Sequence, residues 1–143
     1  MISHVWSVLC RTANIDDATN NISLQEVVEQ INLIGDGKKL PGNASVDIEI
    51  VSLYSRTDLD KPAKGEARWS MESPSGKMVS TKERIEIDLT HYRRLRSRTK
   101  IRLLPIDMPG LYWFVGELRQ DGDEWERVAR IPLEVAGPKA VAD

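Results

Sequence analysis

The sequence is poor in the residues that form covalent and metal cross-links. Its 143 residues include one cysteine, Cys10, and two histidines, His4 and His91. A single cysteine excludes an internal disulfide, so nothing in the sequence indicates an oxidising compartment. These three residues also fall short of the ligand set of a structural zinc site. We therefore expect no disulfide framework, no bound metal and no cofactor.

Long hydrophobic runs are also lacking. No segment approaches the roughly 20 consecutive apolar residues that a membrane-spanning helix requires. The opening residues, MISHVWSVLCRTANIDD, lack a basic region followed by an apolar run. We therefore expect a soluble, cytoplasmic protein without membrane contact. A hydrophobic content of 41% suits a single domain, for which we predict the boundaries 1–136, followed by a short flexible tail at 137–143.

Motifs for catalysis are missing as well. No glycine-rich loop precedes a helical pattern, which excludes the common phosphate-binding motifs. His4 falls within a strand pattern and His91 at a strand end, and neither has a nucleophile or carboxylate at a suggestive spacing. A hydrolase would require His91 to meet a carboxylate in a pocket. We therefore predict no catalytic residues and a protein that is not an enzyme.

The strongest structural pattern that is present covers residues 109–135, PGLYWFVGELRQDGDEWERVARIPLEV. The aromatic and β-branched run from Tyr112 to Val115 favours a strand. The pair Asp121-Gly122 tolerates the positive φ of a hairpin turn. Residues 125–135 alternate between apolar and charged side chains, which predicts one buried and one exposed face. The first strand is apolar on both faces, so we expect it to be central or covered by another subunit.

Similar patterns predict about eight strands and no helix along the chain. The predicted strands are 3–13, 22–34, 45–56, 67–72, 77–89, 99–106, 111–118 and 125–135. Residues 22–34 also have helical spacing, but we favour a strand with a bulge near Glu26. The apolar residues of 45–56 change parity after Ile50, which a one-residue bulge would explain. Frequent turn signals between these segments are typical of an antiparallel β-sandwich, with a closed barrel as the alternative.

The end of the chain resembles the last two strands of immunoglobulin-like domains. The resemblance rests on the turn residue Gly110, then Tyr112 and Phe114, a hairpin turn at Gly122, and the closing segment 132–135, PLEV. The apolar strand at 3–10, an Asp-rich turn and a second strand are similar to small uncharacterised bacterial proteins with that fold. The resemblance implies an immunoglobulin-like β-sandwich and no particular activity. A single cysteine cannot form the disulfide of many secreted immunoglobulin domains, so no antibody-like or cell-surface role is implied.

A basic window covers residues 91–102, HYRRLRSRTKIR. It holds six cationic residues and no acidic one: Arg93, Arg94, Arg96, Arg98, Lys100 and Arg102. In a chain of net charge −2, this run produces a local positive field suited to phosphates or an acidic protein surface, with Tyr92 available for stacking. The alternative is a solvated connection whose arginines pair with the protein's own carboxylates. A nucleic-acid partner is not favoured, because such proteins are more often basic throughout and interleave several aromatics.

The four tryptophans divide into two groups. Trp6, Trp69 and Trp125 fall on apolar strand faces and are predicted to lie in the core. Trp113 lies on the face opposite Tyr112, together with Leu111 and Val115. These three residues are either an exposed patch for a homodimer or partner, or are buried under a flanking strand or loop.

Two functional hypotheses remain. The leading one is a non-enzymatic interaction module that self-associates or docks on a protein partner through the 111–115 face, the basic window, or both. The alternative is a protein that binds an anion or small ligand through the basic window, using Tyr92, Arg93, Arg94, Arg96, Arg98 and Lys100.

Overall fold

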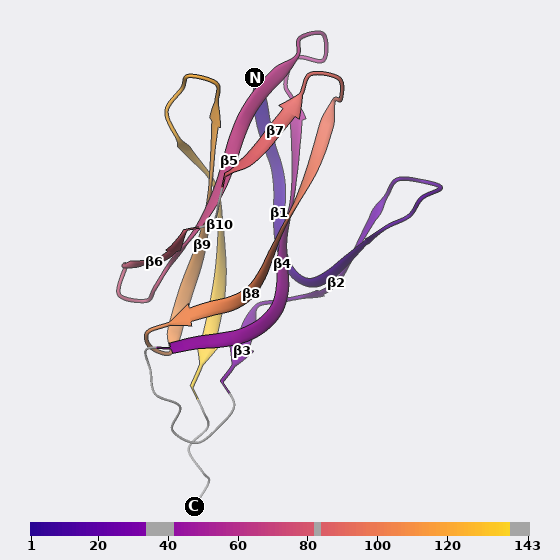
Figure 1. The fold of residues 1–143 in the computed structure, drawn as a ribbon. Coiled ribbons are helices and arrows are strands. Elements are labelled where there is room, and N and C mark those ends of the chain that lie inside the picture. Colours follow the sequence, from indigo (N-terminus) through magenta and orange to yellow (C-terminus); the bar gives the residue numbers. More distant parts are fainter. Residues whose placement is uncertain (34–41, 82–83, 138–143) are drawn as a thin grey trace, which may run out of the picture.

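The computed structural model describes residues 1–33, 42–81 and 84–137, which form ten strands and no helix. The strands are β1 (Ile2–Ile15), β2 (Ile22–Val27), β3 (Gln30–Asn32), β4 (Gly42–Arg56), β5 (Ala63–Glu72), β6 (Met78–Thr81), β7 (Ile85–Leu89), β8 (Arg94–Ile106), β9 (Gly110–Gln120) and β10 (Glu126–Ala136). They form two sheets that pack against each other (Figure 1). The predicted all-β chain of two packed sheets is confirmed. The predicted tail lies outside the described residues from position 138 onward.

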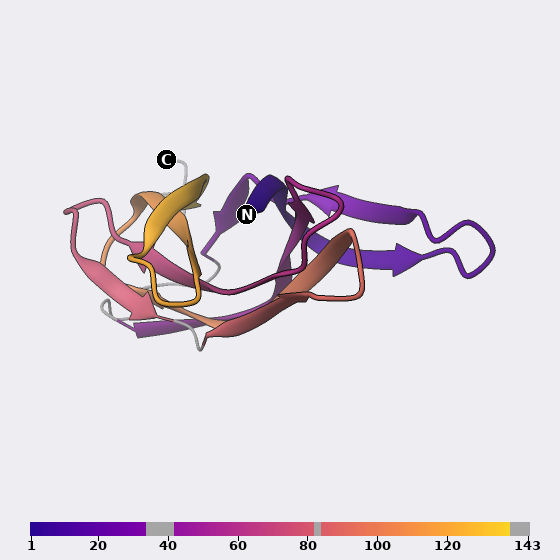
Figure 2. The same cartoon turned by 90° about the horizontal axis from the view of Figure 1, so that it is seen from above.

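The first sheet has four strands in the order β2-β1-β4-β8, and all neighbours are antiparallel. The turn between β1 and β2 is closed by Asp16, whose carboxylate accepts hydrogen bonds from Ala18 N at 3.2 Å and Thr19 Oγ1 at 2.8 Å. Asn20 completes the turn with a φ of 59°, a conformation that asparagine tolerates well. The resulting hairpin extends sideways from the body of the molecule (Figure 2).

The second sheet has six strands in the order β3-β10-β9-β5-β6, with β7 also paired to β5. β9 therefore lies between β10 and β5, which confirms the central position predicted for it. β6 pairs with the end of β5 and β7 with its beginning, so both occupy the same side of β5. β3 is parallel to β10, whereas the other pairs in this sheet are antiparallel.

Two predicted strands each divide in two, so the count of about eight is too low. In segment 22–34, the described residues 22–33 contain strands and no helix, as predicted, but β2 belongs to the first sheet and β3 to the second. Glu26 has a positive φ of 56°. Two residues later, Val28 is buried, and its N–H donates to Leu9 O at 2.8 Å. The bend therefore lies near Glu26, and it moves the chain between sheets. Segment 77–89 divides into β6 and β7.

Apolar side chains form two clusters between the sheets and a third outside them. The larger inner cluster includes Trp69, Tyr112 and Leu133, and the smaller includes Tyr54 and Leu89. The third cluster, Cys10, Ala13 and Val51, lies on the outer side of the first sheet, where Ile22 and Leu24 of β2 pack against it. The β1–β2 hairpin thus covers part of that outer side.

The cover by the β1–β2 hairpin explains the apolar residues on both faces of segment 45–56, for which the sequence predicted a bulge. Ile50 and Val51 belong to different clusters on opposite sides of the sheet, and both are fully buried. The change of parity after Ile50 therefore needs no bulge at that point. The irregularity in the pairing of β4 with β8 lies earlier, between Ser45 and Ile48.

The tryptophan predictions are confirmed only for Trp69, which is 1% exposed in the inner core. Trp6 is half-buried and packs against the outer cluster. Trp125 is not in the core, because the pairing of β10 with β9 shifts between Arg127 and Ala129. A one-residue bulge reverses the facing of every side chain before it. Trp125 therefore lies on the outer side of the second sheet.

The turn from β8 to β9 is fixed by a buried tyrosine. Tyr112 Oη lies 2.6 Å from both Asp107 Oδ1 and Met108 O, and it accepts a hydrogen bond from Met108 N at 3.2 Å. The hydroxyl thus bonds back to the chain four to five residues upstream. Hydrogen bonding to Tyr112 lowers the pKa of Asp107.

Candidate functional site

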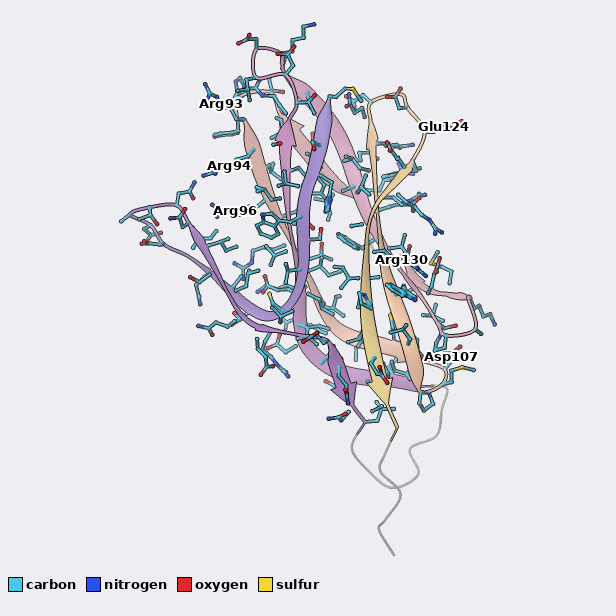
Figure 3. The ribbon with its side chains drawn as sticks, turned by 180° about the vertical axis from the view of Figure 1, so that it is seen from behind. Arg93, Arg94, Arg96, Asp107, Glu124 and Arg130 are labelled. Carbon is cyan, nitrogen blue, oxygen red and sulfur yellow. The ribbon has the colours of Figure 1, made fainter. Side chains whose placement is uncertain are left out.

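The basic window lies mostly on β8, the last strand of the first sheet. Within the described residues, β8 pairs only with β4. Figure 3 shows Arg93, Arg94 and Arg96 following one another along the upper part of this strand, on the side where the β1–β2 hairpin ends. The opposite edge of β8 has no strand paired to it among the described residues.

The cationic side chains of β8 share the outer face of the sheet. Leu95 and Ile101 pack into the inner clusters, so the intervening even-numbered residues face outward, because successive side chains of a strand alternate. Arg96 and Arg98 lie opposite Leu53 and Val51, and Lys100 lies opposite Glu49. Alternation therefore aligns Arg94, Arg96, Arg98 and Lys100 in one row.

Arg98 is committed to a structural ion pair. Its Nε donates to Glu49 Oε1 at 2.6 Å and its Nη2 donates to Glu49 Oε2 at 3.0 Å. Glu49 is 4% exposed, and the hydrogen bonds from Arg98 lower its pKa despite the opposing effect of burial. For Arg98, the prediction that arginines of the window pair with the protein's own carboxylates is correct.

Arg96 and Arg98 also hold the β1–β2 hairpin. Arg98 Nη2 donates to Ala13 O at 3.2 Å, and Arg96 Nη2 donates to Asn20 O in the hairpin turn. Both acceptors are backbone carbonyls, so the contacts depend on the path of the hairpin rather than on its side chains. These two arginines therefore contribute to the cover over the outer cluster.

The remaining cations of the window are unpaired. Arg93, Arg94, Lys100 and Arg102 are exposed, and none forms an ion pair with another described residue. Tyr92 is 68% exposed beside them. We call Arg93, Arg94, Arg96 and Lys100, together with the unpaired side of β8, the basic edge.

The 111–115 face is exposed at one end and covered at the other. Leu111 is 40% exposed and Val115 is 1% exposed. The guanidinium of Arg130 lies 3.7 Å from the centre of the Trp113 ring, in a cation–π contact. Trp113 is thus covered by a side chain of the neighbouring strand β10, rather than by a strand or loop. The three residues share one side of β9, on which Leu111 is exposed, Trp113 is partly covered and Val115 is buried.

Two arginines near Trp125, on the outer side of the second sheet, are matched by carboxylates. Arg68 pairs with Glu117 at 3.0 Å and Arg119 with Glu66 at 3.1 Å. The same two guanidinium groups lie 4.0 and 4.5 Å from the centre of the Trp125 ring. This cluster was missed from the sequence, because the bulge in β10 hides the outward facing of Trp125. Its charges are compensated internally.

The structure brings together one histidine and hydroxyl pair that sequence spacing did not reveal. His4 Nε2 lies 2.7 Å from Ser7 Oγ, which lies 2.6 Å from Ser52 Oγ. The shift in the pairing of β1 between His4 and Trp6 places these residues on the same face. Burial lowers the pKa of His4. No described carboxylate forms an ion pair with either histidine, so neither has the third member of a hydrolytic triad.

The described residues hold no cluster of metal ligands, and the space between the sheets is small. The described residues contain no group of three His, Cys, Asp or Glu side chains suited to a metal ion. A space between the sheets, lined by Ile50, Trp69 and Phe114 among others, has a volume of about 10 Å³, which holds at most one water. No helix in the described part of the chain is long and apolar enough to cross a bilayer.

No protein-family model and no curated protein matches the chain. The basic edge is therefore the candidate site on physical grounds alone.

Proposed function

We propose that this protein is a non-enzymatic interaction module that docks on an acidic protein partner through the basic edge. The observation that carries the proposal is the contrast between the two sheets. On the second sheet, Arg68 and Arg119 have carboxylate partners within hydrogen-bond distance. In the basic edge, Arg93, Arg94 and Lys100 have none among the described residues. Exposed cations aligned on one strand attract an acidic surface and raise its association rate.

The fold in which this edge lies is, in our proposal, immunoglobulin-like. An immunoglobulin sandwich places strands A, B and E side by side in one sheet and G, F and C in the other. The orders β1-β4-β8 and β10-β9-β5 match these two sets. The hydrogen bonds of Tyr112 to Asp107 and Met108 match the tyrosine corner of that fold, in which a hydroxyl near the start of strand F bonds upstream. Both features support the resemblance to small bacterial immunoglobulin-like proteins.

The proposed setting is the cytoplasm. Cys10 is buried and unpaired, and burial raises the pKa of its thiol. A thiol kept neutral in an apolar environment is unreactive, which supports a structural role and agrees with a reducing compartment.

The test compares two triple variants with the same loss of charge. In the first, Arg93, Arg94 and Lys100 are replaced by glutamine. In the second, the exposed residues Lys61, Lys64 and Lys77 are replaced by glutamine. We expect the wild type and the second variant to bind a poly-glutamate peptide at a salt concentration of about 0.05 M. This binding should disappear at about 0.5 M salt. The first variant should bind at least about tenfold more weakly.

Equal binding by the two variants would show that net charge, rather than the basic edge, governs the contact. Isothermal titration calorimetry provides the dissociation constants, and thermal unfolding confirms that each variant is folded. Absence of binding by the wild type at low salt would reject the acidic partner.

A second candidate function is favoured by the same unpaired cations. An anion such as phosphate or a sulfated polysaccharide would also be attracted to Arg93, Arg94 and Lys100. Heparin distinguishes this candidate, because it supplies dense negative charge without a peptide backbone. Tighter, basic-edge-dependent binding of heparin than of poly-glutamate would favour the anion-binding function.

Self-association through the 111–115 face stays a prediction. The cover of Trp113 by Arg130 and the burial of Val115 leave less apolar surface there than the sequence indicates. Light scattering on the wild type and on Trp113→Ala tests it directly. A homodimer that this substitution dissociates would favour the 111–115 face over the basic edge.

A further inference from the structure

We infer that the acidic partner binds as an extended segment that adds a strand to the unpaired edge of β8. This inference rests on the proposed function and specifies how the basic edge recognises its partner. Strand addition supplies main-chain hydrogen bonds for affinity and side-chain contacts at alternate positions for specificity. Both components can be located on β8 from the pairing of the described residues.

The backbone groups that face the unpaired edge belong to the cationic residues. In an antiparallel pair, directly opposite residues alternate between hydrogen-bonded and non-hydrogen-bonded pairs. Arg56 N donates to Arg93 O at 2.9 Å, which makes this opposite pair a hydrogen-bonded one. The register continues without a shift from Ser55 opposite Arg94 to Glu49 opposite Lys100. The non-hydrogen-bonded positions are therefore 94, 96, 98 and 100, whose N–H and C=O groups point away from β4.

The same four residues thus supply outward backbone groups and an outward row of positive charge. An antiparallel strand that pairs with them places its own side chains directly opposite, about 5 Å away, on the same face. Carboxylates at alternate positions of that strand would lie opposite Arg94, Arg96 and Lys100. The recognised partner is accordingly an extended segment with Asp or Glu at every second residue.

A second copy of this chain does not satisfy the site. Pairing of β8 with another β8 would bring arginines and lysines opposite each other, and like charges in cross-strand pairs are destabilising. Cationic side chains on an edge strand are a known protection against such pairing. The row of charge therefore excludes self-addition while it favours an acidic strand.

The fold explains why the edge is open. In an immunoglobulin sandwich, strand D pairs with strand E, the position of β8. Here β7, the strand that precedes β8, pairs instead with β5 in the other sheet. The acidic strand would occupy the position next to β8 that β7 leaves vacant within the described residues.

The first experiment uses a capped peptide of about ten residues that alternates Glu and Thr, and two N-methylated forms of it. In the paired geometry, the Glu residues opposite the cations direct their N–H groups toward β8, whereas the Thr N–H groups point to solvent. Methylation of the Glu amides should weaken binding at least about tenfold. Methylation of the Thr amides gives a peptide of the same charge and the same number of N-methyl groups. This control should change the dissociation constant by less than about threefold.

The second experiment changes the protein. Lys100→Pro removes an outward N–H that makes no bond to β4, a position at which an edge strand tolerates proline. Lys100→Gln removes the same charge but keeps the N–H. We expect the proline variant to bind the unmethylated peptide at least about tenfold more weakly than the glutamine variant, with both variants folded by circular dichroism.

The outcomes separate the two levels of the proposal. If all three peptides bind equally, with loss in the variant lacking Arg93, Arg94 and Lys100, strand addition is wrong and the charged docking surface stands. If no peptide binds the wild type at low salt, both proposals fall. Strand addition is supported if methylation of the Glu amides, but not of the Thr amides, weakens binding. The same conclusion requires that Lys100→Pro binds the peptide more weakly than Lys100→Gln.

Discussion

Glu49 shows how a charged residue is retained inside this protein. It lies on the outer side of the first sheet, opposite Cys10 on β1 and Lys100 on β8, and the hairpin covers that region. Desolvation of a carboxylate is costly unless it is paired and hydrogen-bonded. The two hydrogen bonds from Arg98 meet that requirement. The ion pair of Glu49 with Arg98 therefore helps to hold the hairpin over the outer side of the sheet. It also leaves Arg98 outside the set of unpaired cations on β8.

Replacement of Glu49 by glutamine should lower the free energy of unfolding by about 1–3 kcal/mol, because it removes a charge-assisted partner from Arg98. The exposed pair of Arg11 with Glu26, at 2.7 Å, provides the control. Glu26→Gln should cost no more than about 1 kcal/mol. Urea denaturation of both variants measures the difference, and equal effects would contradict the structural role of Glu49.

The pKa of Glu49 also predicts a dependence on pH. Its pKa in the folded protein is lowered by Arg98, so its stabilising effect is complete above the unfolded pKa. The effect is lost as the pH falls through the folded pKa. The stability difference between wild type and Glu49→Gln should therefore narrow on acidification.

His4 provides a second titration, with His91 as its control. Burial lowers the pKa of His4, so on acidification the unfolded chain takes up a proton before the folded protein does. The stability of the wild type should therefore fall as the pH drops below the ordinary histidine pKa of about 6.5. His4→Gln should remove this dependence, whereas the substitution of the exposed His91 by glutamine should retain it. Urea midpoints between pH 8 and pH 5 test the prediction; an unchanged slope in His4→Gln would contradict it.

At the scale of elements, β5 and β9 fit together because one residue has no side chain. Gly116 lies opposite Trp69, and a Cβ at Gly116 would lie 2.7 Å from Trp69 Cη2. Atoms at that distance overlap, so one of them must move. Gly116 therefore leaves the space that the largest core side chain occupies.

Gly116→Ala should lower the free energy of unfolding by about 1–3 kcal/mol through overpacking. Trp69→Phe removes the ring atoms that the new methyl group would meet. The cost of Gly116→Ala should therefore be smaller in the Trp69→Phe background, which a double-mutant cycle by chemical denaturation measures. The same cost in both backgrounds would show that Trp69 is not the cause.

Local irregularities of the backbone at three points change which side chains lie on which face of a sheet. The shift in β10 turns Trp125 outward, the one in β1 brings His4 and Ser7 together, and the positive φ of Glu26 separates β2 from β3. The two shifts reverse the facing of the side chains on one side of each, whereas the bend at Glu26 moves the chain from the first sheet to the second. A pattern of period two does not locate the shifts in β1 and β10, because it assumes a continuous strand, whereas the irregularity near Glu26 is predicted from the sequence.

At the scale of the molecule, charge is distributed unequally between the two sheets. On the second sheet, Arg68 and Arg119 pair with Glu117 and Glu66, whereas Arg94 and Lys100 of β8 form no ion pair with another described residue. With a net charge of −2, the protein as a whole is close to neutral. Association through the basic edge should therefore be local and salt-sensitive rather than a general attraction to polyanions.

The sequence predicts the positive charge of the candidate site. The run of arginines from Arg93 to Arg98 was identified from the sequence, and so was the alternative that some of them pair internally. Which of them pair could not be known, because Glu49 and Arg98 are 49 residues apart and meet only across β4 and β8. The contact of Arg130 with Trp113 could not be predicted for the same reason, since Arg130 lies on a neighbouring strand.

The sequence alone determined an all-β chain, the hairpin of β9 and β10, the buried position of Trp69 and the positive charge of the 91–102 window. These follow from local properties: strand preference, alternation, turn residues and charge. Only the tertiary structure decided that Arg98 is bound to Glu49, that Trp113 is covered by Arg130, and that one edge of β8 carries no strand among the described residues. Pairing between distant strands sets these three features, because register and sheet order bring together residues that local patterns leave independent.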